Sequence, residues 1–257
     1  MGILLENGKY QVLENIVSEP GYSASVCIDV ETKNNFSEYI FNIYSESSYI
    51  NKFLPLYHAL PHSVCGDFHK VLPGDRCVMA VFDYHKGAPL KKYLDSLAKD
   101  DYPARAEAAG SFLDASLVLA TLPPVFAASV LQPPYTVYTA KDKSVRFNYI
   151  VRPQPETESQ TESQTETPDE KIPAEFVSYL EKAFVKNRYL PETASGFVNK
   201  IRTGEITGFV NICSAWRRLS ADAMNEYLAY RKETFFGYIK RLALTKSRKK
   251  REKLKNL

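Results

Sequence analysis

The chain has 257 residues, of which 44% are hydrophobic and 25% charged, so it can form a substantial core in one large domain or two lobes. Apolar stretches such as 112–122 fall short of the roughly 20 residues that a membrane span needs. The first ten residues lack the apolar segment of a secretory signal. We therefore expect a cytoplasmic protein.

The net charge of +3 comes from the end of the chain, because the rest is net acidic. The last twelve positions contain a single acid, Glu252, and seven basic residues: Lys246, Arg248, Lys249, Lys250, Arg251, Lys253 and Lys255. The basic isoelectric point thus describes a tail and not a nucleic-acid-binding surface.

The cysteines form no CxxC pair and are typical of reduced core thiols: Cys27, Cys65, Cys77 and Cys213. Three histidines near Cys65 (His58, His62 and His69) raise the question of a metal site. Pro61 breaks the helix that an i,i+4 pair of ligands would need. We therefore predict no metal.

The first third of the chain has the alternation of strands, interrupted by turn residues such as Pro20-Gly21. The predicted elements are three strands within 10–44, a helix capped by Ser47 or Ser48 and ended by Pro61, and strands over 68–72 and 76–84.

A turn at 87–89 precedes a change to helical periodicity. The predicted helices cover 90–97, 103–121, 174–185, 194–202 and 220–244, with a hairpin within 135–151. Residues 156–170 repeat Glu, Thr, Ser and Gln without a large apolar residue, so we expect a disordered, solvated linker.

Five strands with one helix after the third, followed by a helical region, resemble a protein kinase. The most specific segments are Asp67–Val71 and Val78–Leu94, which are similar to the kinase run from the fourth strand through the hinge to the next helix. The resemblance covers about residues 9–150 and, more loosely, 174–203.

The resemblance implies an α+β, two-lobed protein kinase-like fold, with a small antiparallel β lobe and a mainly helical lobe. The implied divisions are a β lobe at 1–86, a helical lobe at 87–210 with the acidic insert 154–171, and a terminal helix and tail at 211–257. Phe82 corresponds to the gatekeeper, and Asp83, Tyr84 and His85 to the hinge backbone that bonds adenine in kinases.

Phosphoryl transfer needs a phosphate cradle, a cation, bound metal and a base. By the resemblance, Ser18, Pro20 and Ser23 replace the three glycines of the phosphate-binding turn. Asn42 replaces the phosphate-binding lysine, and a neutral amide cannot offset phosphate charge.

The remaining catalytic positions are also changed. Val130 corresponds to the catalytic aspartate, Tyr135 to the metal-binding asparagine and Tyr149 to the metal-binding aspartate of the DFG motif, so no carboxylate remains for magnesium. No Ser-His-Asp or Cys-His pattern offers other chemistry. We predict a pseudokinase that is not an enzyme and has no cofactor.

Two main functions remain open, beside a weaker third, the binding of RNA or DNA phosphates by the basic tail. The first is a scaffold or regulator that binds a protein partner, either an active kinase or a membrane-associated complex such as the secretion systems that contain pseudokinase subunits. The second is a nucleotide or small-molecule sensor that uses the inter-lobe cleft. An open cleft between Phe82 and Tyr149 would favour the sensor, and side chains filling it would argue against it.

An aromatic and apolar stripe runs from Met224 to Leu242 ahead of the basic tail. It is typical of packed core, but an apolar face beside cations also suits a partner or an anionic membrane surface. The cations that would bind there are Lys246, Arg248, Lys249, Lys250, Arg251 and Lys253. No aromatic residue follows Leu244, so we do not expect recognition of nucleic-acid bases.

Overall fold

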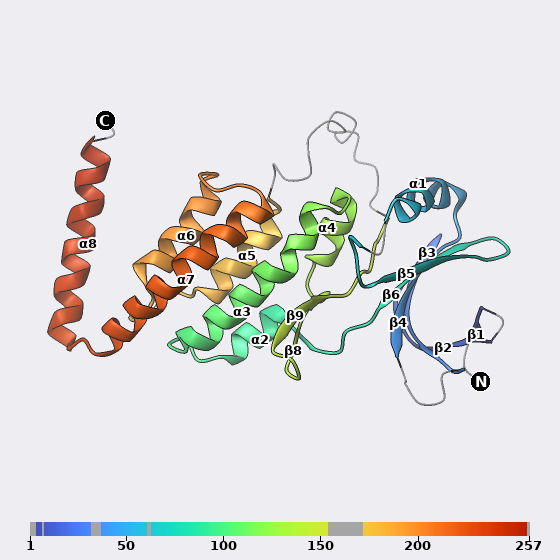
Figure 1. Ribbon diagram of the computed structural model, residues 1–257, viewed down its shortest axis with the longest axis horizontal. Coiled ribbons are helices and arrows are strands. Elements are labelled where there is room, and N and C mark those ends of the chain that lie inside the picture. The colour runs from blue at the N-terminus through green and yellow to red at the C-terminus, as the bar shows by residue number, and fades with distance from the viewer. Residues whose placement is uncertain (1–3, 7, 32–36, 61–62, 154–171, 256–257) are drawn as a thin grey trace.

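The computed structural model describes residues 4–6, 8–31, 37–60, 63–153 and 172–255, with the backbone alone for Leu4 and for 249–255. The fold is mixed α+β. An antiparallel sheet lies at one end of an elongated molecule, helices occupy the middle, and the last helix lies at the opposite end (Figure 1). The predicted linker at 156–170 lies outside the described residues.

The large sheet has six antiparallel strands in the order β1-β2-β3-β4-β6-β5. The strands are β1 (Leu4–Leu5), β2 (Tyr10–Glu19), β3 (Tyr22–Asp29), β4 (Glu38–Tyr44), β5 (Phe68–Pro73) and β6 (Val78–Asp83). The five strands predicted from alternation are confirmed. The two-residue β1 was not predicted, because so short a strand leaves no pattern.

Helix α1 (Ser47–His58) covers one face of this sheet and buries Phe53 and Tyr57. The predicted serine cap is wrong, because Glu46 precedes the helix and no side chain caps its backbone. The Ser48 hydroxyl donates instead to the Glu46 carboxylate, at 2.7 Å.

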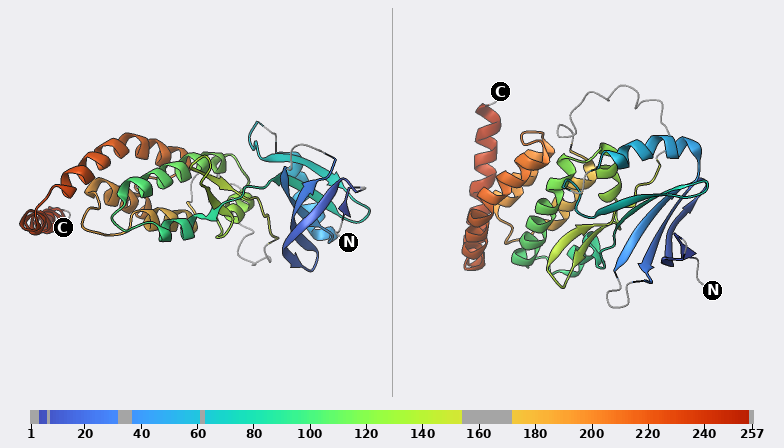
Figure 2. Two further views of the ribbon diagram at one scale, coloured as in Figure 1. Left: turned by 90° about the horizontal axis from the view of Figure 1, so that it is seen from below. Right: turned by 45° about the vertical axis from the view of Figure 1, so that its right-hand side comes forward.

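The other face of the sheet encloses a second, smaller core of Tyr10, Cys27, Phe41, Met79 and Val81. The sheet curves around this core (Figure 2). Its two edges approach each other, since the Lys70 amine on β5 lies 3.2 Å from the carboxylate of Glu6, directly after β1. The small core is therefore shielded without a helix on that side.

The helices of the middle part share one large core with a three-stranded sheet. They are α2 (Leu90–Ser96), α3 (Tyr102–Ala115), the 3-10 helix η1 (Ser116–Ala120), α4 (Pro124–Val130), α5 (Ala174–Ala183), α6 (Glu192–Arg202) and α7 (Phe209–Arg231). The strands are β7 (Ala88–Pro89), β8 (Thr136–Thr139) and β9 (Ser144–Phe147).

One buried arginine joins two helix ends in this core. Arg105 on α3 donates to the carbonyls of Leu94 (2.8 Å), Leu97 (2.9 Å) and Ala98 (3.0 Å) at the end of α2. It also donates to Lys182 at the end of α5, at 3.1 Å. A cation here satisfies carbonyls that the helices leave unpaired and complements both helix dipoles. Burial lowers the pKa of the guanidinium, which nevertheless stays protonated.

The single helix predicted over 220–244 is wrong. The chain turns after Arg231, and a separate helix, α8 (Phe235–Lys255), leads away from α7 (Figure 1). The Thr234 hydroxyl accepts a hydrogen bond from the Gly237 amide, as an N-cap residue does. The aromatic and apolar stripe predicted from Met224 to Leu242 is therefore divided between two helices. Tyr227 packs against Tyr102 in the core, and the residues after 234 lie on α8.

Among the residues that the structure describes, no helix has the length and apolar character needed to cross a bilayer.

Candidate functional site

The turn expected to correspond to a phosphate-binding loop is a tight hairpin. Ser18 pairs with Ser23 across β2 and β3, and only Pro20 and Gly21 lie between the strands. Gly21 has a φ of +74°, and a Cβ at this position would lie 2.7 Å from the Cβ of Glu46. The turn packs against the start of α1, so its backbone is not arranged around a phosphate.

Asn42 on β4 is fully buried, and its side-chain amide takes part in three hydrogen bonds. Its Nδ2 donates to the Tyr149 carbonyl at 2.8 Å. Its Oδ1 accepts from the Val151 amide and from the Tyr22 hydroxyl, each at 2.8 Å. The hydrogen bond between Asn42 and Tyr149 joins residues that are 107 positions apart in the sequence. A neutral side chain thus joins two of the positions singled out by the resemblance.

Tyr44, two residues further along β4, makes a parallel link. Its hydroxyl donates to the Val151 carbonyl at 2.7 Å and lies 2.6 Å from the hydroxyl of Tyr57 on α1. Burial raises the pKa of Tyr44 and of Tyr57, so both are neutral hydrogen-bonding groups near neutral pH.

The Tyr149 ring fills the space beside β6. It stacks on Phe82 with ring centroids 4.9 Å apart and planes 13° apart, and both side chains are buried. Burial raises the pKa of Tyr149 well above its usual value. The aromatic packing continues through Phe68, Tyr57 and Phe126. The open cleft between Phe82 and Tyr149 that would favour a sensor is absent from this described region.

The Asn148 side chain forms hydrogen bonds with the backbone of the predicted hinge. Sequence reasoning missed this contact. Its Oδ1 accepts from the His85 amide at 2.9 Å, and its Nδ2 donates to the His85 carbonyl at 3.1 Å. The Asp83 amide donates to the Asp67 carbonyl, and the Tyr84 amide donates to the Glu38 carbonyl. All three hinge amides, from Asp83 to His85, are therefore already bonded within the chain.

Two imidazoles face the carboxylates around this segment. His69 Nε2 lies 2.6 Å from Asp83, and His85 Nε2 lies 3.3 Å from Asp67 without the geometry of a hydrogen bond. Within the described ranges no group of three or more His, Cys, Asp or Glu could hold a metal ion. His62, a member of the cluster considered above, lies outside those ranges.

Val130 and Tyr135, which the resemblance assigns to the catalytic loop, lie at the end of α4 and in the turn that follows it. Val130 is fully buried in α4, and its carbonyl accepts from the Thr136 hydroxyl at 2.9 Å. The Tyr135 carbonyl accepts a hydrogen bond from the backbone N–H of Asn148 at 2.8 Å. Burial raises the pKa of the Tyr135 phenol. Neither side chain can act as a base or hold a metal near neutral pH.

A pocket of about 360 Å³, lined by both polar and apolar residues, lies between the β2–β3 turn and the turn after α4. Arg152 and Glu19 form an ion pair across it, at 3.6 Å. The lining residues are Glu19, Ser129, Gln132, Pro133, Tyr135, Ile150, Arg152 and Pro153. The pocket is separate from the Phe82–Tyr149 stack, and its charges already neutralise each other.

The predicted basic surface lies far from these contacts, on α8 at the other end of the molecule (Figure 1). Lys246 and Arg248 are exposed. The helix continues through Lys249, Lys250, Arg251 and Lys253, for which the structure describes only the backbone. The structure therefore separates the tail residues from the kinase-related positions.

Comparisons with known proteins assign no family to the chain. No protein-family model matches it, and no curated protein matches its sequence significantly. The kinase resemblance rests on the residues quoted above.

Proposed function

We propose that this chain is a pseudokinase, with a two-lobed kinase-like fold that transfers no phosphate and serves as a scaffold or regulatory module for a protein partner. The observation that carries the proposal is the Asn42 amide bonded to the backbone of Tyr149 and Val151. Where a kinase needs a cation and a metal-binding carboxylate, this chain has two neutral residues bonded to each other.

The Asn148 amide supports the same proposal on the adenine side. An amide presents one donor and one acceptor, the same pair that an adenine edge presents. Asn148 pairs with both backbone groups of His85, one of the residues that the resemblance assigns to adenine binding. A nucleotide would have to break both bonds and displace the Tyr149 ring from Phe82.

These contacts support the proposal that the chain transfers no phosphate. Phosphoryl transfer depends almost entirely on positioning and electrostatic stabilisation. The hydrogen bonds of the Asn42 amide that the structure gives go to the Tyr149 carbonyl, the Val151 amide and the Tyr22 hydroxyl, which are neutral groups. Function then depends on the outer surfaces. We propose an active kinase or a component of a membrane-associated complex as the partner.

The pocket between the β2–β3 turn and the turn after α4 favours a second candidate function, a small-molecule sensor. Its volume of about 360 Å³ falls in the lower range of ligand sites, and it offers Gln132, Ser129 and the Arg152–Glu19 pair as polar contacts. A small polar molecule is the ligand class that suits it, and the pocket does not require displacement of Asn42 or Asn148.

Thermal unfolding with ATP, with and without magnesium, tests the proposal. We expect no change in Tm for the full chain, because the hinge and the Asn42 site are occupied from within. The control Arg152→Ala alters the pocket alone. An ATP-dependent rise in Tm that persists in Arg152→Ala would contradict the scaffold proposal, whereas a rise lost in Arg152→Ala would favour the pocket sensor.

Binding of a candidate partner completes the test. A purified partner should bind equally well before and after nucleotide removal with apyrase. Partner binding that requires added ATP would favour the sensor.

A further inference from the structure

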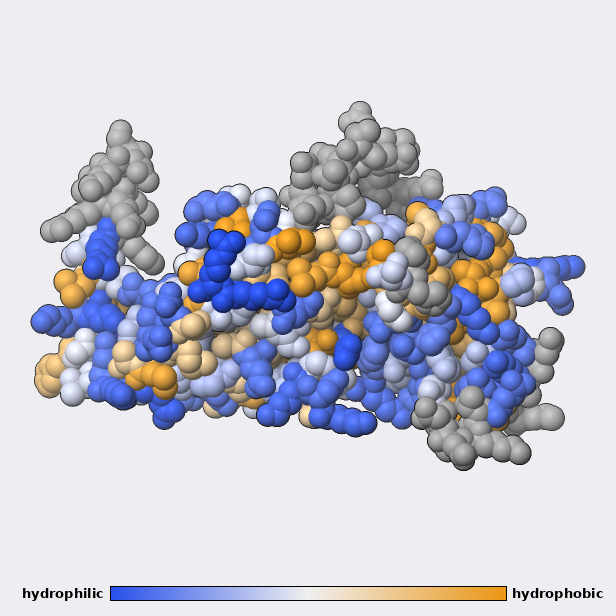
Figure 3. Space-filling view, viewed as in Figure 1, coloured by the Kyte–Doolittle hydropathy of each residue, from blue (hydrophilic) through white to orange (hydrophobic). Residues whose placement is uncertain are grey.

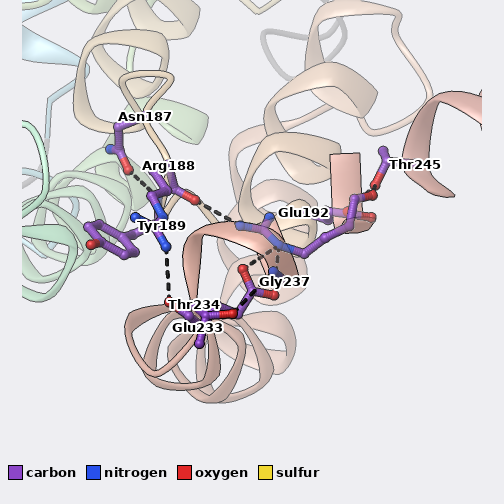
Figure 4. A network of polar contacts seen from close by, with 9 residues as sticks. Asn187, Arg188, Tyr189, Glu192, Glu233, Thr234, Gly237 and Thr245 are labelled. Atoms are coloured by element: carbon purple, nitrogen blue, oxygen red, sulfur yellow. Dashed lines mark hydrogen bonds and ion pairs between the residues drawn. The ribbon is translucent and has the colours of Figure 1, made fainter. Parts of the chain in front are cut away.

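Helix α8 is attached to the rest of the protein by polar contacts along one side. The Arg241 Nε lies 3.0 Å from both carboxylate oxygens of Glu233, and its terminal nitrogen donates to the Arg188 carbonyl at 2.9 Å (Figure 4). One turn later, the Thr245 hydroxyl donates to Glu192 at 2.6 Å. The side of α8 that carries residues 241 and 245 therefore faces the protein.

Large apolar side chains occupy another side of α8 and are exposed. The exposed fractions are 62% for Phe235, 84% for Phe236, 49% for Ile239 and 39% for Leu242. The spacing of 235, 239 and 242 places these three residues on one face of the helix. Apolar surface at this end of the molecule is visible in Figure 3.

The same face becomes basic in the second half of α8. Lysines occupy 246, 249 and 253, the positions that continue the spacing of three and four from Leu242. Lys246 is exposed. The sequence from 235 to 251 contains no Asp or Glu, and Glu252 has the spacing of the side that carries residues 241 and 245, so no acid lies among these lysines.

We propose that this face of α8, residues 235–253, binds an anionic phospholipid surface. Aromatic and aliphatic side chains at one end would enter the boundary between headgroups and acyl chains, while the lysines contact the phosphates. A row of cations without acids matches a diffuse negative surface better than a protein groove, whose recognition needs paired polar groups. The proposal does not depend on the kinase resemblance, because α8 lies outside the residues that carry it.

Co-sedimentation of the full chain with phosphatidylcholine vesicles, with and without phosphatidylserine, tests the proposal. We expect binding only to vesicles that contain phosphatidylserine, and weaker binding at high salt. Lys246→Gln/Lys249→Gln should weaken binding by about 30-fold, at roughly fivefold for each charge near the surface. Phe235→Ser/Ile239→Ser should weaken it by at least about tenfold.

A matched control is available on α7, where Val210 and Leu228 are 48% and 49% exposed. Val210→Ser/Leu228→Ser also removes two exposed apolar side chains and should leave vesicle binding unchanged. Circular dichroism should show the same helix content in all variants. Equal losses in the α7 and α8 variants, or equal binding to neutral vesicles, would overturn the proposal.

A fluorescent reporter separates lipid from protein occupants. Phe236→Trp should shift its emission to the blue on anionic vesicles, while Trp216 stays packed between Phe184 and Phe197. In sedimentation velocity without lipid, the unmodified chain should be monomeric. A dimer that disappears in Phe235→Ser/Ile239→Ser would show that a second copy binds this face. An emission shift with a purified acidic protein, but not with vesicles, would show that a protein binds it. Either result would contradict the lipid proposal.

Discussion

Asn42→Ala should destabilise the protein strongly, because one buried amide satisfies three other buried groups. The substitution leaves the Val151 amide, the Tyr149 carbonyl and the Tyr22 hydroxyl without their partner. At about 1–1.5 kcal/mol for each group, the loss is about 3–5 kcal/mol. A typical domain has only about 5–15 kcal/mol of stability in total, so the variant should be close to unfolding.

Urea unfolding followed by circular dichroism measures this loss from the midpoint and slope. Asn15→Ala is the matched control, since Asn15 is exposed and accepts one hydrogen bond, from Ser25 at 2.7 Å. It should cost less than about 1 kcal/mol. Tyr22→Phe removes a single bond of the network and should cost about 1 kcal/mol. An Asn42→Ala loss no larger than that of Asn15→Ala would refute the reasoning.

Two further predictions concern buried groups. Arg105→Lys keeps the charge but loses the planar guanidinium that donates to four carbonyls. It should lower the free energy of unfolding by about 2–4 kcal/mol, measured by urea titration. A loss near zero would show that water replaces the guanidinium. Burial raises the pKa of Tyr22, Tyr44, Tyr57 and Tyr149, so the folded state favours their neutral forms. Their contribution to stability is present below pH about 10 and decreases as the pH rises further. In an absorbance titration at alkaline pH these phenols should ionise together with unfolding, and gradual ionisation with intact circular dichroism would contradict that expectation.

The strands and the first helix could be predicted because their signals are local. Alternation over 10–44 and the helical spacing before Pro61 depend only on which faces are buried. Short elements were missed for the same reason, since Ala88–Pro89 and Pro124–Val130 carry less than two periods of any pattern. The break before α8 had a signal in Thr234, three residues before Gly237, which the continuous aromatic stripe concealed.

The candidate site could be predicted in its composition but not in its contacts. The resemblance singled out Asn42 and Tyr149, and the structure brings them together. The bond from Asn148 to His85 joins residues 63 positions apart, and its two-point geometry depends on how the sheet and the helices pack. The polar residue in the otherwise apolar run 147–151 was the one local sign that it has a buried partner.

The bonds from Asn42, Tyr44 and Asn148 also have a mechanical consequence. Enzymes with two halves open and close to admit substrate and release product. Here side chains on β4, and one beside the hinge, hold the segment 148–151 against both the sheet and its connection to the helices. A partner that touches both halves would meet a surface whose shape is already set, so association would cost little conformational freedom and would favour one fixed orientation of the two proteins.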